Sequence, residues 1–234
     1  MERRFVCCSL VFPGRDIRKS LVVTFAASLM IAVGLLGSAD ARLVVIVGSE
    51  TGSLFFDPMR LAEDRGQIVN MVQMGDGAGA IVLGPAVTQG AALEAAWIGT
   101  IGLGRAPGIQ QHHGALEFAH DFAEILKSGR QLFDADVTTA TRLGHSPDKA
   151  DFIIPHQVSG RVRGQASAHL GVAPERIFVN ADRLGNCGSA AIWIAFAELR
   201  AATAELRGGD EPTVTLATTQ AFASFWLIPR LADF

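Results

Sequence analysis

The sequence is poor in cysteine and carries no excess of positive charge. Among its 234 residues are three cysteines, Cys7, Cys8 and Cys187, and the adjacent two are poor partners for each other. This composition excludes a disulfide framework and favours a reduced compartment. The formal net charge of -3 argues against a nucleic-acid-binding surface. We therefore expect a cytoplasmic protein that binds no nucleic acid.

A metal-binding signature is lacking as well. His112, His113 and His120 have a spacing that would place two of them on one face of a helix, as metal ligands require. No His-Glu-x-x-His pattern accompanies them, and a solvated helix start is the favoured interpretation. Heptads, solenoid repeats and low-complexity tails are also lacking. The sequence predicts no metal site.

Apolar residues, in contrast, are abundant. They make up 49% of the chain, against 18% for charged residues, so much of the chain is expected to be buried. The longest apolar run, residues 21–36, follows several basic residues and precedes the small residues Ala39 and Ala41. This pattern fits a cleaved signal peptide, a membrane span or a core helix. The run is marginal for a span, which needs about 20 apolar residues. The strand pattern directly after it favours the core helix, and we expect no membrane association.

The order of apolar and small residues is typical of an α/β protein. A continuous apolar strand is predicted at residues 42–50, and another buried strand ends residues 74–83. Residues 75–79, Gly-Asp-Gly-Ala-Gly, superficially evoke a dinucleotide-binding loop, but they precede a strand and do not join a strand to a helix. A tight structural turn is favoured there. Helices are predicted at residues 112–129, 158–170 and 189–206, and a final core strand at residues 214–218.

Two short segments carry the polar residues with the clearest chemical use. A β-branched run ends at Pro155 and delivers His156 just beyond a predicted strand. A second short strand is predicted at residues 177–180. It is followed by Asn186, which has glycines close on both sides, and then by a predicted apolar helix. An imidazole and a carboxamide can both donate as neutral groups to a thioester carbonyl that becomes an enolate or a tetrahedral oxyanion. Each residue also has a structural interpretation: a core histidine bonded to a backbone carbonyl, and an asparagine that caps the next helix.

Four segments together carry a family resemblance. In order and spacing across residues 22–234, they resemble the β-ketoacyl-acyl-carrier-protein synthase III family of the thiolase superfamily. The four segments are residues 45–50, 75–79, 155–157 and 185–190.

The resemblance implies a fold and a division of the chain. The expected fold is α/β, a thiolase-like layered α-β-α-β-α sandwich of two similar halves, with an incomplete first half. Residues 1–20 form an unmatched amino-terminal segment. Residues 21–105 match the remainder of the amino-terminal half, and residues 106–234 match the carboxy-terminal half. Family members are usually homodimers.

The resemblance also implies an acyltransferase of fatty acid or related biosynthesis. Such enzymes load an acyl group from acyl-coenzyme A onto a cysteine and condense it with malonyl on acyl carrier protein. The substrates are thus coenzyme A and phosphopantetheine thioesters, with no bound cofactor. His156 and Asn186 match the catalytic pair that stabilises the enolate. The segment that matches the carrier-protein contact consists of Gln157, Val158, Ser159, Gly160 and Arg161.

Two departures from the family pattern affect catalysis. The usual spacing back from the first strand places the nucleophile at Val22, which cannot form a thioester. Cys7 and Cys8 lie about four helical turns too early. Cys187, beside the asparagine, is interpreted as a packing residue. The glycines that precede the final strand in the family are replaced by other residues at 219–226.

Two interpretations fit these departures. In the first, the chain is a truncated or mis-started product whose first residues are foreign to the fold. In the second, it is a divergent homologue without a nucleophile that transfers acyl groups directly, decarboxylates malonyl thioesters or serves as a non-catalytic partner. We favour an enzyme, either a homodimer or a heterodimer with a related synthase. The alternative is a non-catalytic subunit that partners an intact synthase.

Overall fold

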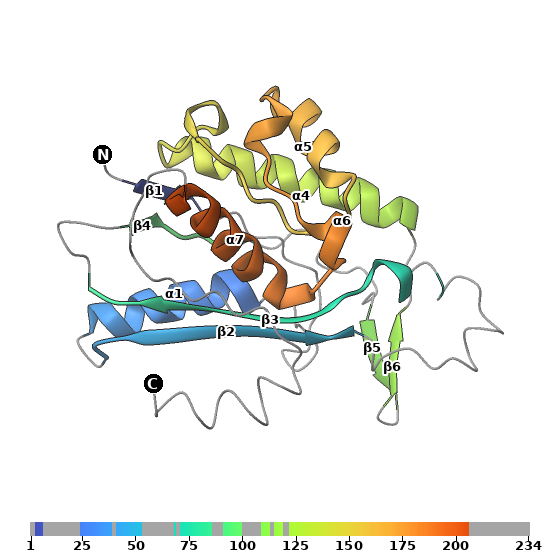
Figure 1. Cartoon of the computed structure of the whole chain (residues 1–234), viewed down its shortest axis with the longest axis horizontal. Coiled ribbons are helices and arrows are strands. Elements are labelled where there is room, and N and C mark those ends of the chain that lie inside the picture. Colours follow the sequence, from blue (N-terminus) through green and yellow to red (C-terminus); the bar gives the residue numbers. More distant parts are fainter. Residues whose placement is uncertain are drawn as a thin grey trace. The chain divides into compact units, whose positions relative to one another are not determined.

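The computed structural model shows a chain of mixed helices and strands (Figure 1). It describes residues 3–6, 24–38, 41–52, 68, 71–85, 91–99, 109–112, 115–118 and 122–205. The elements, with 3₁₀ turns labelled η, are β1 (Arg3–Val6), α1 (Thr24–Gly37), β2 (Val44–Thr51), β3 (Asp76–Leu83), β4 (Ala91–Ala95), β5 (Ile109–His112), β6 (Ala115–Phe118), α4 (Phe122–Arg142), η3 (Pro147–Lys149), α5 (Val162–Leu170), η4 (Pro174–Arg176), α6 (Ala181–Leu184), η5 (Gly188–Ala190) and α7 (Ala191–Glu205).

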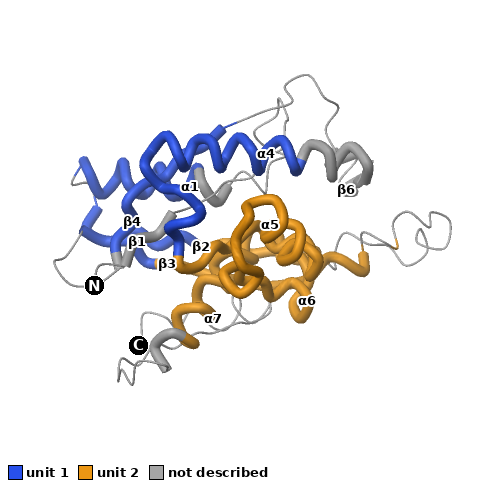
Figure 2. The backbone as a smooth tube through the Cα atoms, turned by 90° about the horizontal axis from the view of Figure 1, so that it is seen from above, with its two compact units in different colours: residues 1–46, 82–150 blue, residues 47–81, 151–234 orange. Residues whose placement is uncertain are grey.

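The chain forms two compact units that alternate along the sequence (Figure 2). Unit 1 comprises residues 1–46 and 82–150, and unit 2 comprises residues 47–81 and 151–234. The family resemblance implies boundaries at residues 20 and 105. These boundaries separate matched segments of the family and not compact units, and they stay a prediction.

Unit 1 contains the helix predicted from the apolar run, but a core position is confirmed for only two of its residues, since Met30, Ile31 and Val33 are exposed. The apolar run forms α1, of 14 residues, in which Leu29 and Ala32 are buried. No helix in the described part of the chain is both long and apolar enough to cross a membrane. In α4, buried Leu132, Asp136 and Ala140 recur every four residues, which is the spacing of one helix face. The Trp97 indole donates a hydrogen bond of 3.1 Å to the Asp136 carboxylate and so satisfies this buried acid.

The helix predicted at residues 112–129 is wrong in both bounds. Strands β5 and β6 pair antiparallel over residues 109–118, and α4 begins only at Phe122. The alternating apolar residues Leu116 and Phe118 fit the period of a strand. Gly129 does not end the helix, because a glycine inside a helix costs only about 1 kcal/mol. His112 lies in β5, so the three histidines do not share one helix; His113 and His120 lie outside the described residues.

Unit 2 contains most of β2 and β3, which pair with each other (Figure 1). The predicted strand at residues 42–50 is confirmed as β2, whereas the turn predicted at residues 75–79 is wrong, since β3 begins at Asp76. Alternate glycines of this strand share one face, and α7 packs directly on their backbone. A Cβ on Gly79 would lie 2.8 Å from the Cβ of Trp193, and one on Gly77 would lie 3.0 Å from the Cδ1 of Ile194. The glycines therefore permit close packing of a helix on a strand.

In unit 2, one helix follows each of the two predicted site segments along the chain. The helix predicted at residues 158–170 is confirmed as α5 with a later start, and it ends at Gly171, whose φ of 64° suits glycine. The helix predicted at residues 189–206 is confirmed as α7 after the short turn η5. The two short strands around residues 153 and 177 are reduced to one parallel β-bridge. The strand predicted at residues 214–218 lies outside the described residues.

Candidate functional site

His156 follows a short paired segment that a proline ends. The Ile153 N–H donates to the Arg176 carbonyl at 2.7 Å, and the Phe178 N–H donates back to the Ile153 carbonyl at 2.9 Å. Pro155 has no N–H and cannot continue this pairing. The chain then turns, with the Val158 N–H donating to the His156 carbonyl at 2.9 Å. His156 thus lies on a short turn that is anchored on one side by β pairing.

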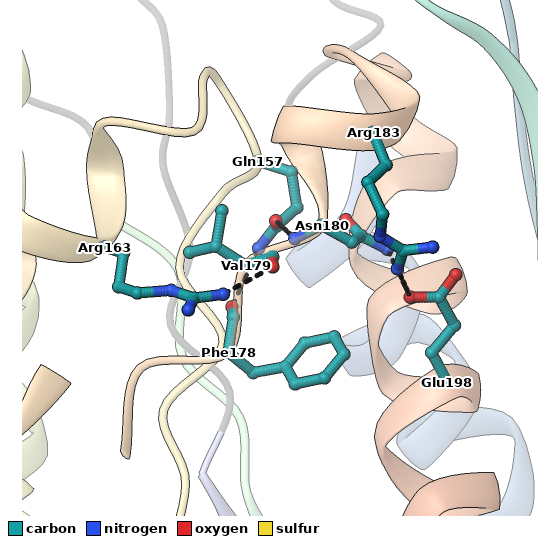
Figure 3. A network of polar contacts seen from close by, with 7 residues as sticks. All are labelled: Gln157, Arg163, Phe178, Val179, Asn180, Arg183 and Glu198. Atoms are coloured by element: carbon teal, nitrogen blue, oxygen red, sulfur yellow. Dashed lines mark hydrogen bonds and ion pairs between the residues drawn. The ribbon is translucent and has the colours of Figure 1, made fainter. Parts of the chain in front are cut away.

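Gln157 fixes this turn from inside the protein. Its side chain is fully buried, at 0% exposure. The side-chain amide donates to the Pro155 carbonyl at 2.7 Å. It also donates to the Phe178 carbonyl at 3.3 Å, and its oxygen accepts the Asn180 N–H at 2.8 Å (Figure 3). The prediction that Gln157 contacts a carrier protein is therefore wrong for its side chain, because every polar atom of that side chain is engaged internally. Its role is to hold the backbone around His156.

The rest of the predicted carrier-protein segment is more accessible. Val158 and Ser159 are half-buried, while Gly160 and Arg161 are exposed. A Cβ on Gly160 would lie 2.9 Å from the Cβ of Asp182, so the segment passes close to α6. The carrier-protein contact by these four residues stays a prediction.

A polar network connects the His156 turn to α6 and α7 (Figure 3). Asn180, which is 2% exposed, donates its side-chain amide to the Glu198 carboxylate at 3.1 Å. The same carboxylate pairs with Arg183 at 2.7 Å, and Arg163 donates to the Val179 carbonyl at 3.0 Å. The network thus fixes the segment directly after His156 to α6, which precedes Asn186 in the chain.

Asn186 is held by backbone bonds on both sides. Its N–H donates to the Gln73 carbonyl at 2.7 Å, and its carbonyl accepts the Gly75 N–H at 3.0 Å. Its side-chain oxygen accepts the N–H of Gly188, the first residue of η5, at 3.1 Å. The predicted capping role is not confirmed, because Cys187 is the N-cap residue of η5, and the Asn186 side chain instead closes a local turn two residues long. Such a bond fixes the plane of the carboxamide and leaves the NH₂ group free to donate elsewhere.

The side chains of His156 and Asn186 both offer hydrogen-bond donors that carry no charge. Burial lowers the pKa of His156 from 6.5 to about 4, because desolvation penalises the charged imidazolium. The residue keeps some exposed surface, so a ligand could reach it. Among the described residues, no hydrogen bond engages the His156 imidazole or the Asn186 NH₂ group, and none joins the two. Each side chain can therefore donate a hydrogen bond to a ligand.

Cys187 lacks the accessible and readily ionised thiol that a nucleophile needs. It is 2% exposed and packs with Ala190, Ala191 and Ile194. Desolvation first, and then the nearby Asp76 and Glu50 charges, raise the pKa of its thiol to about 11. The interpretation of Cys187 as a packing residue is confirmed. Val22, Cys7, Cys8 and residues 219–226 lie outside the described part of the chain.

One residue of this region was missed by the sequence analysis. Glu50, the penultimate residue of β2, is 5% exposed. Desolvation and the nearby Asp76 charge raise the pKa of its carboxyl, while backbone hydrogen bonds from Thr51 and Ser189 oppose this shift. An acid at the end of an otherwise apolar strand was the available signal. Within the described residues, no group of three or more His, Cys, Asp or Glu side chains could hold a metal ion.

Comparison with known proteins assigns the two matched parts of this chain to the same protein family. Residues 19–102 match the family described as 3-oxoacyl-[acyl-carrier-protein (ACP)] synthase III, and residues 140–217 match its C-terminal domain. Together the two matches cover more than half of the chain. A β-ketoacyl-[acyl-carrier-protein] synthase III of Deinococcus deserti is 30% identical over 185 residues, which cover 74% of this chain and 50% of that protein. The corresponding protein of Staphylococcus haemolyticus is 27% identical and covers 82% of this chain and 58% of its own length. The chain therefore spans about half the length of these relatives.

Solved structures agree with this result. The synthase III of Thermus thermophilus is 26% identical, with a TM-score of 0.58 over 76% of this chain and 56% of that one. The Pseudomonas aeruginosa structure has a TM-score of 0.62 at 24% identity, over 76% of this chain and 56% of that one. The predicted α/β, thiolase-like fold is confirmed by this similarity.

Proposed function

Because the chain belongs to the 3-oxoacyl-[acyl-carrier-protein] synthase III family, we propose that it acts on acyl thioesters as a condensing-type acyltransferase. His156 and Asn186 are the proposed catalytic residues. The observation that carries the proposal is that each offers a neutral donor with no partner among the described residues.

The proposed step is decarboxylation of a malonyl thioester. The bond between the carboxylate carbon and the α-carbon breaks, carbon dioxide leaves, and the electron pair forms an enolate on the thioester. His156 and Asn186 donate hydrogen bonds to the enolate oxygen as its charge develops. The enolate carbon then attacks an acyl thioester or takes a proton. Loss of one such donor typically costs about 2.7–4 kcal/mol of barrier, a factor of about 10²–10³ in rate.

The proposed substrates are malonyl thioesters of coenzyme A or of the phosphopantetheine arm of acyl carrier protein. The exposed residues Gly160 and Arg161 support a carrier-protein contact, since they lie directly after the His156 turn. Because decarboxylation needs no cysteine, it is the step that a chain with Val22 at the nucleophile position would retain. The homodimer and the cytoplasmic location stay predictions.

The test is carbon dioxide release from malonyl-coenzyme A and malonyl-acyl carrier protein by the purified full chain. His156→Ala and Asn186→Ala should each lower kcat by about 10²–10³. Gln165→Ala, on the exposed face of α5, is the matched control and should leave the rate unchanged. Rates unaffected by both site substitutions would refute the assigned roles.

A second candidate is a non-catalytic subunit that partners an intact synthase. It is favoured by the apolar side chains that α1 exposes, with Met30 at 44%, Ile31 at 63% and Val33 at 49%. Co-purification with a complete synthase, together with no turnover by the chain alone, would decide for this candidate.

A further inference from the structure

Glu50 is a buried acid that the proposed chemistry does not use. It lies in unit 2 at the end of β2, with 5% of its surface exposed. A carboxylate is costly to bury unless hydrogen bonds satisfy it. Its partners are the backbone N–H groups of Thr51 and Ser189. Glu50 thus connects the end of β2 to the turn that follows Asn186.

The same turn is tied to β2 by a second bond and by close contact. The Ser189 hydroxyl donates to the Ser49 carbonyl at 3.2 Å. Gly188 has a φ of 49°, in the left-handed region that favours glycine. A Cβ at Gly188 would overlap the Glu50 Oε2 and lie 2.8 Å from its Cδ. The Gly188 backbone therefore lies directly against the Glu50 carboxylate.

Gly188 is also the residue that orients Asn186. Its N–H donates to the Asn186 side-chain oxygen at 3.1 Å, which determines where the NH₂ group of that carboxamide points. A displacement of Gly188 would rotate or release the carboxamide. A small misplacement of a catalytic donor can cost about a hundredfold in rate.

We propose that Glu50 is a positioning residue for Asn186. It holds the backbone of Gly188 and Ser189 so that the Gly188 N–H fixes the Asn186 carboxamide with its NH₂ group available to an oxyanion. This inference rests on the donor role proposed for Asn186. It assigns to Glu50 no contact with substrate.

The kinetic test is a double-mutant cycle in the full chain, with malonyl-coenzyme A decarboxylation as the readout. Glu50→Ala should lower kcat about tenfold or more with little change in KM. In an Asn186→Ala background the same substitution should have no further effect, because the donor that it positions is already gone. An equal fold-loss in both backgrounds would mean that Glu50 acts elsewhere, and it would overturn the proposal.

A second readout does not depend on activity. In a ¹⁵N-labelled full chain, the side-chain NH₂ signals of Asn186 are assigned by their loss in Asn186→Ala. Glu50→Ala should shift or broaden these signals and the Gly188 amide signal, whereas Glu175→Ala, an exposed acid in η4, should not. Unchanged Asn186 signals would refute the positioning role. Should Glu50→Ala fail to fold, Glu50→Gln removes one of the two acceptor oxygens at nearly the same shape and is judged by the same criteria. A wild-type chain without decarboxylation would reject the proposed function, while the NMR result would still decide the role of Glu50.

Discussion

His156 and Cys187 lie in the same unit, and desolvation shifts the pKa of each side chain in favour of its neutral form. For His156 the neutral form is useful, because a neutral imidazole can donate one hydrogen bond without the cost of a buried charge. For Cys187 the neutral form is an obstacle, because the thiolate is the nucleophile. The same physical cause therefore favours a donor role for one residue and removes a nucleophilic role from the other.

The lowered pKa of His156 predicts a pH-dependent loss of stability. The folded value of about 4 lies below the ordinary value of 6.5, so the unfolded chain takes up this proton first as the pH falls. The free energy of unfolding should decrease from about pH 6.5 downward, and the contribution should level off near pH 4. His156→Gln should remove this part of the decrease, which is on the order of 2 kcal/mol at about pH 4.5.

Denaturant unfolding of both proteins at about pH 7 and about pH 4.5 measures the difference. Other titrating groups are common to the two proteins and cancel in the comparison. Parallel losses of stability in wild type and variant would show that His156 is not desolvated in the folded chain.

The helices and strands that the sequence predicts correctly are those whose hydrophobic pattern is formed by neighbouring residues. The apolar strand β2 and the apolar helix α7 were predicted because a continuous run of such residues is informative by itself. The glycines of β3 were misread as a turn, because the helix that requires them follows more than a hundred residues later in the chain. Strand β6 was misread as the start of a helix, because short apolar runs fit both periods.

The residues of the candidate site also divide into those that the sequence predicts and those that it does not. His156 and Asn186 could be selected from the sequence because their residue types and flanking glycine or proline suggest a chemical role. The burial of Gln157 and of Glu50 could not, because it depends on partners from other segments, Asn180 for the first and Ser189 for the second. Positioning residues are therefore harder to predict than donors.

The close contact between β3 and α7 leads to a prediction for two glycines. Gly79→Ala should destabilise the protein by about 2 kcal/mol, because the new Cβ would lie 2.8 Å from the Cβ of Trp193 and 3.1 Å from the backbone N of Ile194. Gly164→Ala, on the exposed face of α5 with no atom within 4 Å of the new Cβ, should stabilise it by about 0.5–1 kcal/mol. Urea unfolding gives both values. Changes of the same sign would contradict the packing described for β3.

At the scale of the whole molecule, the chain combines a recognisable family fold with unusual apolar exposure. It spans 50% of the length of the Deinococcus deserti relative. Besides α1, it exposes Val45 at 59% and Val47 at 55% on β2, and Val82 at 58% on β3. Large exposed apolar patches commonly mark association surfaces. The prediction that Val22 occupies the nucleophile position can be tested by substitution.

Val22→Cys tests that position directly. The family resemblance predicts that the nucleophile occupies position 22, so a cysteine introduced there should accept an acyl group from a thioester. After incubation with acetyl-coenzyme A, we expect intact-mass analysis to show one added acetyl group on the variant and none on the wild type. Ile31→Cys, an exposed position in the interior of α1, is the matched control and should stay unmodified. Equal modification of both variants would mean that position 22 has no special reactivity. Acetylation of the wild type at Cys7 or Cys8 would place the nucleophile in the first residues, and the chain would then need no partner to supply it.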